Sequence, residues 1–484
     1  LIGDYMEFKY KTKPYAHQVE ALEKSYDKKN YAYFMEMGCG KSKVLLDNIY
    51  WLWENKEIDT AIIIAPKGVY MNWKNSEIPI HLLEDMDADI YTWKANPTQA
   101  EKRHLSLGVT KRDKFRILLM NIESFVTKKA PVFLESFTHR SEFMVAIDES
   151  TTIKNIKAKR TKAVMKFGTT AKYKRILTGS PITQSPLDLY SQCAFLSKSL
   201  LGYDSYWSFQ GKFAIVKQQR MGSHSFNQVV GFKNLEELTN KLKTFSHRVT
   251  KKEALDLPPK IYTTRQVELT SIQREHYKSM KQTSVVYLEQ GGMVTAPEVM
   301  TRLLRLQQLL CGYLVSDDGE TVELANNRLN VMMEVIEEMN GKVIIWSRFR
   351  HDIKKIRKEL EKIYGSKSTV TYFGDTSQED RDLAIHNFQN DDNTRFFVSN
   401  TQTGGRGITL TAATNVIYYS NDFNFESRRQ SEDRCHRIGQ NETVLYVDLI
   451  CSDTVDTHIV KSLLHKDVLA GKTLGEEVLE WLKV

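Results

Sequence analysis

The chain has 484 residues, of which 41% are hydrophobic and 26% charged, a globular composition large enough for two or three domains with their own cores. It contains no apolar run near twenty residues and no visible signal sequence, so we expect neither a transmembrane helix nor secretion. The formal net charge of +8 permits a polyanionic partner without requiring one.

The five cysteines are scattered along the chain, and no two of them form a Cys-x-x-Cys pair. This pattern argues against a zinc site or a disulfide framework and for a reducing compartment. We therefore expect an intracellular location, in the cytoplasm or nucleoid or in the cytoplasm of a host cell. The chain starts at Leu1 and not at Met, so we also expect that an N-terminal extension is missing. The cysteines are Cys39, Cys193, Cys311, Cys435 and Cys451.

The first chemical motif follows an aromatic strand that starts near Tyr31. The strand leads into Gly38-Cys-Gly-Lys-Ser42 and then into an apolar helical stretch, which is the context of a phosphate-binding loop. Lys41 would reach the β- and γ-phosphates, and Ser42 would ligate Mg²⁺. Met35 stands where the general pattern has its first glycine, so the motif alone also fits an ordinary strand-to-helix turn. The nucleotide-binding candidates here are Met37, Gly38, Cys39, Gly40, Lys41 and Ser42.

Apolar strand candidates then recur with helical stretches between them, and this alternation predicts a parallel sheet covered on both faces. One of them, Phe143 to Ile147, ends at Asp148-Glu149, and open α/β sheets place their chemistry at the carboxyl ends of strands. Asp148 would hold Mg²⁺ through its water shell, and Glu149 would orient or deprotonate an attacking water. The alternative is a solvated pair of acids at a strand end. The expected strands are Thr60 to Ala65, Phe115 to Met120, Phe143 to Ile147 and Arg175 to Thr178.

From about residue 200 to 335 the pattern is mostly helical, and strand alternation then resumes. Leu257-Pro-Pro-Lys260 interrupts the helical pattern. We predict an α/β fold with two parallel-sheet lobes: residues 1–200, a helical insertion at 201–335, and residues 336–484 with C-terminal helices. The expected helices are Leu235 to Leu242, Ser271 to Leu288 and Val299 to Leu310. The expected later strands are Lys342 to Trp346, Ser368 to Tyr372, Arg395 to Val398, Val416 to Tyr419 and Val444 to Val447.

The segment 399–440 carries a glycine-rich loop and, about thirty residues later, Gln430, Arg434 and Arg437. Their spacing of i, i+4 and i+7 predicts one face of a helix. Two arginines on a stripe without an acidic partner suit an anion. Because the phosphate-binding loop lies in the other α/β unit, we expect a nucleotide in the cleft between the two.

These motifs, taken in order from about residue 14 to 450, resemble a Snf2-family motor of helicase superfamily 2. Gln18 takes the position of the family glutamine that reads adenine. Asn72-Trp73 follows an element that is associated with contact to the DNA backbone. The matching segments are Pro14 to Gln18, Met35 to Ser42, Ile62 to Lys67, Ile147 to Asn155, Leu177 to Ile182, Ile344 to Phe349, Tyr372 to Ser377, Thr403 to Ala413 and Gln430 to Gln440.

The resemblance implies two RecA-like lobes and an ATPase that uses ATP and Mg²⁺. It also implies a compact motor of the fork-remodelling or strand-annealing kind, without chromatin accessory domains. The catalytic residues it implies are Lys41, Asp148, Glu149, Arg434 and Arg437. In addition to the residues of the phosphate loop, the residues implied to bind nucleotide are Gln18, Gly405, Gly407 and Gln430. The candidates for DNA contact are Lys67, Asn72, Thr178, Ser399, Thr403, Gly405 and Arg406.

Two residues depart from the family pattern. Ser150 stands where the family has His after Asp-Glu, which alters a contact that links hydrolysis to the rest of the site, and Met35 replaces an aspartate. Four tryptophans could stack on bases, but their apolar surroundings favour core packing: Trp51, Trp53, Trp73 and Trp346.

We expect a monomeric ATP-dependent translocase on double-stranded DNA, without sequence specificity and without membrane contact. One alternative is a strand-separating helicase of the same superfamily, although no wedge hairpin is evident. Another is a nucleotide-switched DNA- or protein-binding module with little turnover.

Overall fold

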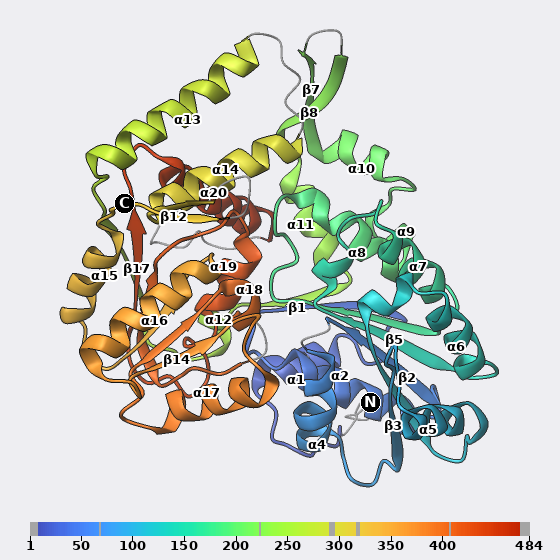
Figure 1. Ribbon diagram of the computed structural model, residues 1–484. Helices are drawn as coiled ribbons and strands as arrows, with labels where there is room; N and C mark the ends of the chain where they lie inside the picture. Colours follow the sequence, from blue (N-terminus) through green and yellow to red (C-terminus); the bar gives the residue numbers. More distant parts are fainter. Residues whose placement is uncertain are drawn as a thin grey trace. The chain divides into compact units, whose positions relative to one another are not determined.

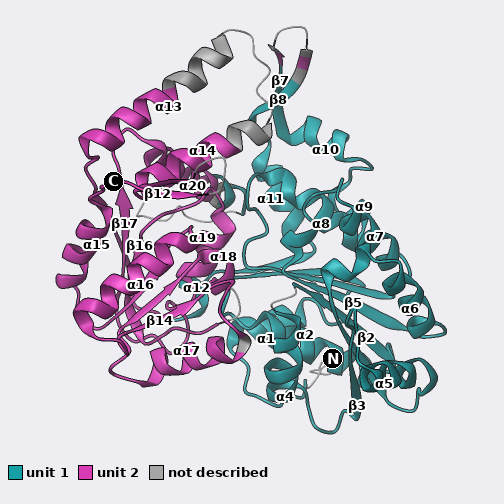
Figure 2. Cartoon of the chain, in the orientation of Figure 1, with its two compact units in different colours: residues 1–218, 227–256, 469–477 teal, residues 219–226, 257–468, 478–484 magenta. Residues whose placement is uncertain are grey.

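The computed structural model describes residues 8–66, 69–221, 224–289, 296–315, 320–405 and 408–474. The chain divides into two compact units (Figure 2). Unit 1 comprises residues 1–218, 227–256 and 469–477, and unit 2 comprises residues 219–226, 257–468 and 478–484. Within the described ranges, no helix has the length and apolar character needed to span a bilayer.

Unit 1 is built on a seven-stranded parallel sheet in the order β3-β4-β2-β5-β6-β1-β9 (Figure 1). Its central strands are almost entirely apolar and buried because helices cover both faces of the sheet. The four strands expected after the phosphate loop are confirmed, whereas β3 and β9 were missed because they are short, polar edge strands. The strands are β1 Asn30–Met35, β2 Thr60–Ala65, β3 Ala88–Thr92, β4 Phe115–Asn121, β5 Phe143–Asp148, β6 Tyr173–Leu177 and β9 Ser246–Val249.

The register of this sheet aligns the carboxyl ends of four strands. Tyr33 of β1 lies opposite Leu177 of β6, and Asp148 of β5 lies opposite the same Leu177. On the other side of β1, Met35 lies opposite Val249 of β9. The loops that follow β1, β5, β6 and β9 therefore meet at one edge of the sheet.

The helices of unit 1 pack on this sheet, and short helical turns occur among them. Segment 70–81 contains a π-helical turn, in which the Ile78 N–H donates to the Trp73 carbonyl. The helices are α1 Ala16–Glu23, α2 Lys41–Glu54, α3 Tyr70–Asn72, the π turn Trp73–Glu77, α4 Ile78–His81, α5 Gln99–Thr110, α6 Lys129–Thr138, α7 Lys159–Gly168, α8 Leu189–Leu196, α9 Lys198–Leu201, α10 Tyr206–Phe213, α11 Leu235–Lys243 and α12 Lys251–Ala254, with 3₁₀ turns at Ile122–Val126, Ser150–Ile153 and Pro186–Asp188.

Unit 2 is built on a six-stranded parallel sheet in the order β10-β17-β16-β13-β15-β14. The five strands predicted after residue 335 are confirmed within two or three residues at each end, and the α/β prediction of two parallel sheets is confirmed. The strands are β10 Lys260–Gln266, β13 Lys342–Trp346, β14 Thr369–Tyr372, β15 Phe396–Ser399, β16 Ala413–Tyr418 and β17 Val444–Ile450, beside a small antiparallel pair, β11 Tyr313–Val315 and β12 Thr321–Glu323.

The helices predicted in the middle of the chain are present as α11, α13 and α14, but strands interrupt them. The β7–β8 pair forms a two-stranded sheet, while β9 and β10 join the main sheets of units 1 and 2. Residues 201–335 therefore contribute to both units. The remaining elements are β7 Ala214–Met221, β8 His224–Phe232, α13 Ser271–Glu289, α14 Ala296–Leu310, α15 Arg328–Glu337, α16 Arg350–Tyr364, α17 Gln378–Asn390, α18 Thr401–Gly404, α19 Phe425–Glu432 and α20 Val455–Leu474.

A buried charge cluster joins α19 to the strands of unit 2. The Arg428 guanidinium donates to both oxygens of Asp448, at 2.6 and 2.9 Å, and its Nε donates to Glu432 at 2.8 Å. Burial alone would raise the pKa of Glu432, but the charges of Lys260 and Arg428 lower it to about 2. Glu432 is therefore ionised, and its charge is compensated by Lys260 and Arg428 together.

We predict that Arg428→Met lowers the stability of unit 2 by about 3–5 kcal/mol, because it leaves the buried Asp448 without its ion-pair partner and removes one of the two cations beside Glu432. Urea unfolding, monitored by limited proteolysis of unit 2, measures this loss of stability. Arg350→Met is the matched control: Arg350 is exposed beside Asp375 and its loss should cost under about 1 kcal/mol. Equal effects of the two substitutions would contradict the role given to Arg428.

Candidate functional site

The loop after β1 has the geometry of a phosphate-binding loop. β1 ends at the buried Met35, the chain turns through Gly38 and Gly40 with φ of 87° and 82°, and α2 begins at Lys41. Positive φ values are accessible to glycine at little cost, which explains these two positions. The helix N-terminus consequently presents its unsatisfied N–H groups at the end of the loop.

α1 is bound to this loop by two side chains. Gln18 is buried, and its Nε2 donates to the Cys39 carbonyl at 3.2 Å, while His17 Nε2 donates to the same carbonyl at 2.9 Å. A Cβ on Gly40 would come within 2.0 Å of Gln18 Nε2. The approach of Gln18 to the loop therefore requires glycine at position 40, and it brings the predicted adenine-reading residue against the phosphate loop.

The Lys41 side chain folds over the loop. It is 9% exposed, and its Nζ donates to the carbonyls of Met35 and Glu36 at 2.9 and 3.3 Å. Met35 contributes its backbone carbonyl and not its side chain. This contact therefore does not depend on the side chain that replaces the family aspartate. The lysine charge lies among backbone dipoles, where an anion can compete for it.

Asp148 and Glu149 follow β5 at the same edge of the sheet. One Asp148 oxygen accepts the indole N–H of Trp73 at 2.9 Å and the other accepts the Glu149 backbone N–H at 3.0 Å. Burial raises the pKa of Asp148, while the Trp73 hydrogen bond and the charge of Lys41 oppose this change. Glu149 has φ of 51°, a left-handed conformation that costs about 1–3 kcal/mol for a residue with a side chain.

The donor set at this edge suits Mg²⁺. The part of the chain that the structure describes contains no group of three or more His, Cys, Asp or Glu side chains able to cage a metal. Mg²⁺ keeps several waters and takes one or two carboxylates together with substrate phosphates. Asp148 and the Ser42 hydroxyl would hold it, and a divalent charge would compensate the desolvated carboxylate of Asp148.

Ser150 links the acidic segment to the turn after β6 through an intermediate residue. It is fully buried, and its hydroxyl donates to Gln192 Oε1 at 2.7 Å. Gln192 Nε2 in turn donates to the Pro181 carbonyl at 2.7 Å. A second link runs from the Thr178 hydroxyl to Glu149 at 3.3 Å. The substituted serine thus keeps a hydrogen-bonded connection between these segments, and sequence reasoning missed Gln192 because it lies in a separate helix, α8.

A further missed contact ties β9 to the phosphate loop. Glu36 accepts the Lys251 backbone N–H at 2.9 Å and lies 3.5 Å from the Arg248 guanidinium. Arg248 also donates to the carbonyls of Phe34 and Gly179, at 2.9 and 3.0 Å. The loop is therefore supported on the side of β9 as well as on the side of α1.

The arginine segment of unit 2 differs from the prediction. α19 ends at Glu432, so Arg434 and Arg437 lie in the turns that follow and not on one helical face with Gln430. The spacing argument failed because the helix stops at Glu432, before the two arginines. Gln430 is buried and its amide donates to Glu426 at 3.2 Å.

The two arginines have different surroundings. Arg434 is 2% exposed and donates to the carbonyls of Gln430 and Ile408, at 2.8 and 3.1 Å. Arg437 is half-buried and donates to the Thr409 hydroxyl at 2.8 Å. Both therefore anchor the arginine segment to the end of the glycine-rich loop, with Arg437 the more accessible.

The Leu-Pro-Pro-Lys segment packs beside these arginines in unit 2. The His436 Nε2 donates to the Pro258 carbonyl at 2.8 Å. Lys260 pairs with Glu432 at 3.2 Å and with Asp433 at 3.8 Å. The residues on either side of Arg434 are consequently held by the start of β10.

The predicted DNA contacts fall into three groups. Asn72 and Thr403 are partly exposed. Thr178 and Ser399 are 0% exposed, and the Ser399 hydroxyl donates to the Tyr372 carbonyl, so neither side chain is accessible in this structure. Gly405 is buried at the end of α18. Lys67 and Arg406, together with the nucleotide candidate Gly407, lie outside the described residues.

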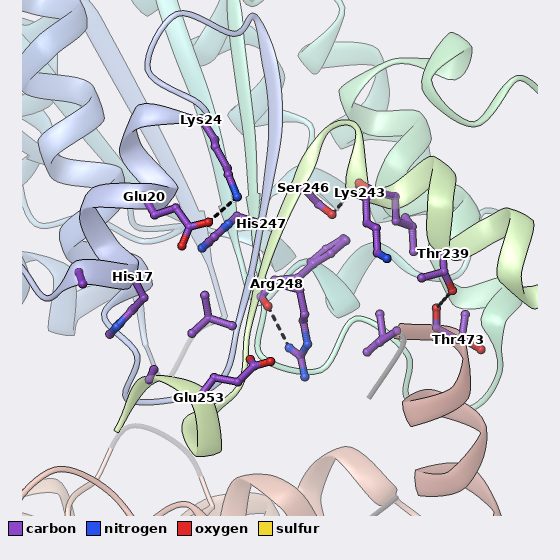
Figure 3. A pocket seen from close by; sticks show the side chains of 16 residues that line it. His17, Glu20, Lys24, Thr239, Lys243, Ser246, His247, Arg248, Glu253 and Thr473 are labelled. Carbon is purple, nitrogen blue, oxygen red and sulfur yellow. Dashed lines mark hydrogen bonds and ion pairs between the residues drawn. The ribbon is translucent and has the colours of Figure 1, made fainter. Parts of the chain in front are cut away.

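A pocket of about 750 Å³ lies on another face of α1 (Figure 3). His17 and Glu20 of α1 and Lys24, which follows α1, line it and face His247 and Arg248 of β9. Its lining includes neither Gln18 nor any residue of the phosphate loop. Two of its lining residues, His17 and Arg248, contact the phosphate loop, but the loop itself lies outside the pocket.

Comparison with known proteins gives a consistent family assignment. Residues 17–313 match the SNF2-related domain, and residues 327–439 match the helicase conserved C-terminal domain. An ATP-dependent helicase of Mycoplasma genitalium is 27% identical over 452 residues, covering 92% of this chain and 40% of that protein. The mouse chromodomain-helicase-DNA-binding protein 1-like is 26% identical over 443 residues, covering 89% of this chain and 46% of that protein.

Among solved structures, the SWI2/SNF2 ATPase core of Sulfolobus solfataricus in complex with double-stranded DNA is similar to this chain. The identity is 25%, the coverage is 97% of this chain and 96% of that one, and the TM-score is 0.43. The chain spans less than half the length of the two curated relatives named above.

We predict that Gly40→Ala weakens adenine-nucleotide binding about 5- to 30-fold, because the left-handed φ costs about 1–2 kcal/mol for alanine and its Cβ displaces Gln18. Equilibrium binding of fluorescent ATP and GTP analogues measures the loss, which should be larger for ATP. Gly211→Ala is the control, since its Cβ would meet nothing within 4 Å. Unchanged ATP affinity in Gly40→Ala would contradict the packing of Gln18 on the loop.

Proposed function

This chain belongs to the SNF2-related family of ATP-hydrolysing enzymes, and from that membership we propose that it couples ATP hydrolysis to movement along double-stranded DNA. The single observation that supports hydrolysis most is the meeting of Lys41, Asp148 and Glu149 at one edge of the unit 1 sheet. Register alone brings these residues together, although more than a hundred positions separate the lysine from the acids.

Phosphoryl transfer requires positioning and charge neutralisation more than covalent chemistry. In the proposed reaction the loop N–H groups and Lys41 bind the β- and γ-phosphates. Mg²⁺, held by Ser42 and Asp148, would neutralise charge on the phosphate oxygens. Glu149 orients the attacking water, and its hydrogen bond from Thr178 and its left-handed backbone fix the carboxylate for this role.

Unit 2 supplies the proposed arginine. Arg437 is the better candidate for contact with the γ-phosphate because it is half-buried, whereas Arg434 is buried against two carbonyls. An arginine of this kind contributes about 10³–10⁵ in rate in comparable enzymes. If it engages only when the units close, hydrolysis depends on closure, and by reciprocity the nucleotide biases closure.

Contact with DNA is proposed to follow the phosphate backbone. Such contact uses cations and amide donors and reads little sequence. Asn72 and Thr403 are retained as candidates because they are accessible, and Lys67 and Arg406 are retained for their charge. The net charge of +8 supports a polyanionic partner. Duplex DNA without sequence preference is therefore the proposed track.

Hydrolysis without DNA, with single-stranded DNA and with duplex, combined with displacement assays, tests the proposed function. We expect duplex to stimulate turnover and the chain to displace the third strand of a triplex while leaving duplexes paired. Separation of a plain duplex would replace this proposal with a strand-separating helicase. Turnover that no DNA changes would leave a nucleotide-switched binding module.

We predict that Lys41→Ala abolishes hydrolysis and nucleotide binding, whereas Arg437→Ala lowers kcat by at least about 10³-fold and leaves ATP affinity within a few-fold. The lysine meets the ground-state phosphates, while the arginine acts on charge in the transition state. Steady-state kinetics and equilibrium binding separate the two effects. Arg357→Ala, which removes an exposed arginine of α16 paired with Glu361, should change neither parameter. Equal loss of ATP affinity in both site variants would contradict the role of Arg437.

A further inference from the structure

Within the described residues, the indole of Trp73 is the one group outside the acidic segment that donates a hydrogen bond to Asp148. The indole is 1% exposed, and its Nε1 lies 2.9 Å from Asp148 Oδ2. The two residues are 75 positions apart, in the π-helical turn 73–77 and at the end of β5. Turns of π-helix are uncommon and occur frequently at functional sites.

The hydrogen bonds leave the Asp148 carboxylate little freedom. Oδ2 is held by the indole and Oδ1 by the Glu149 backbone N–H, which is part of the same turn. Without the indole, one oxygen of a carboxylate that is 8% exposed would lose its partner from outside this segment. A buried acceptor without a donor is costly, so the side chain would rotate to find another partner.

The placement of the π turn explains why tryptophan suits this position. Trp73 belongs to the apolar core of unit 1, where its neighbours in the helical segment 70–81 are Tyr70 and Ile78. The ring is therefore fixed by packing, and only its N–H reaches the carboxylate. A donor fixed in this way orients Asp148 more precisely than a flexible polar side chain would.

We propose that Trp73 is a positioning residue for the metal-binding carboxylate of Asp148. It holds the carboxylate in the orientation that accepts the water shell of Mg²⁺ bound with nucleotide. The inference rests on the proposed ATP site, and it adds a residue that the sequence motifs do not assign. Groups that orient metal-binding side chains typically contribute 10- to 100-fold to metal affinity.

The test is Trp73→Phe, which keeps an aromatic ring and removes the donor. A fluorescent ADP analogue is bound first in EDTA and then with Mg²⁺ titrated in. We expect binding in EDTA to stay within about twofold of the unchanged chain, while the Mg²⁺ concentration for half-maximal enhancement rises about tenfold. This readout requires neither DNA nor turnover, so a failure of the translocase proposal leaves it measurable.

Trp93→Phe is the matched control. Trp93 is also a buried tryptophan of unit 1, packed on Phe133 with ring centroids 4.7 Å apart, and its Nε1 has no hydrogen-bond partner among the described residues. It should leave the Mg²⁺ dependence unchanged. Equal shifts in both variants, or no shift in Trp73→Phe, would overturn the proposal. Loss of binding in EDTA as well would also overturn it, because Trp73 would then support the loop as a whole.

A double-substitution cycle provides the second measurement if Trp73→Phe is poorly stable. Asp148→Asn removes the charge through which Trp73 is proposed to act. Adding Trp73→Phe to Asp148→Asn should therefore cause no further change in Mg²⁺ dependence. A further change of the same size as in the unchanged chain would show that Trp73 acts elsewhere.

Discussion

The register of the parallel sheet in unit 1 is the constraint on which the candidate site depends. Parallel strands end at the same edge, and the pairing of β1 with β6 and β9, and of β6 with β5, brings four loops to that edge. A shift of one residue in β5 would turn Asp148 to the other face of the sheet. The fully buried, β-branched strands resist such a shift, because every alternative exposes apolar surface or buries a charge.

Within this frame, the site combines buried charge with backbone strain. Asp148 is desolvated, Glu149 has a left-handed backbone, and Lys41 rests on carbonyl groups that an anion can replace. Each feature costs stability in the absence of nucleotide. Each is also relieved or used by a bound Mg²⁺–nucleotide, which supplies opposite charge to both the lysine and the carboxylate. The stability that the site costs the nucleotide-free protein is thus linked to its affinity for Mg²⁺–nucleotide.

The sequence predicted the parts of this site that depend on local patterns. Gly38 to Ser42 and Asp148-Glu149 follow buried strands whose composition is diagnostic, and both are found where expected. It did not predict the end of α19 at Glu432, because a spacing of i, i+4 and i+7 does not say where a helix stops. It also did not predict Gln192 or the role of the Trp73 indole, because these contacts join residues far apart in sequence. The edge strands β9 and β10 were missed because they lack the apolar run of central strands.

The chain between Arg248 and Lys260 gives the two candidate half-sites a physical connection. At its start, Arg248 and the Lys251 N–H hold Glu36 of the phosphate loop within unit 1. At its end, Pro258 and Lys260 hold His436 and Glu432 within unit 2. Six residues (252–257) lie between these two sets of contacts, and Pro258 and Pro259 restrict the backbone at the end of the segment. A short, stiff segment that is fixed at both ends transmits a displacement better than a long flexible loop does. The short segment has few conformations through which the displacement could be absorbed.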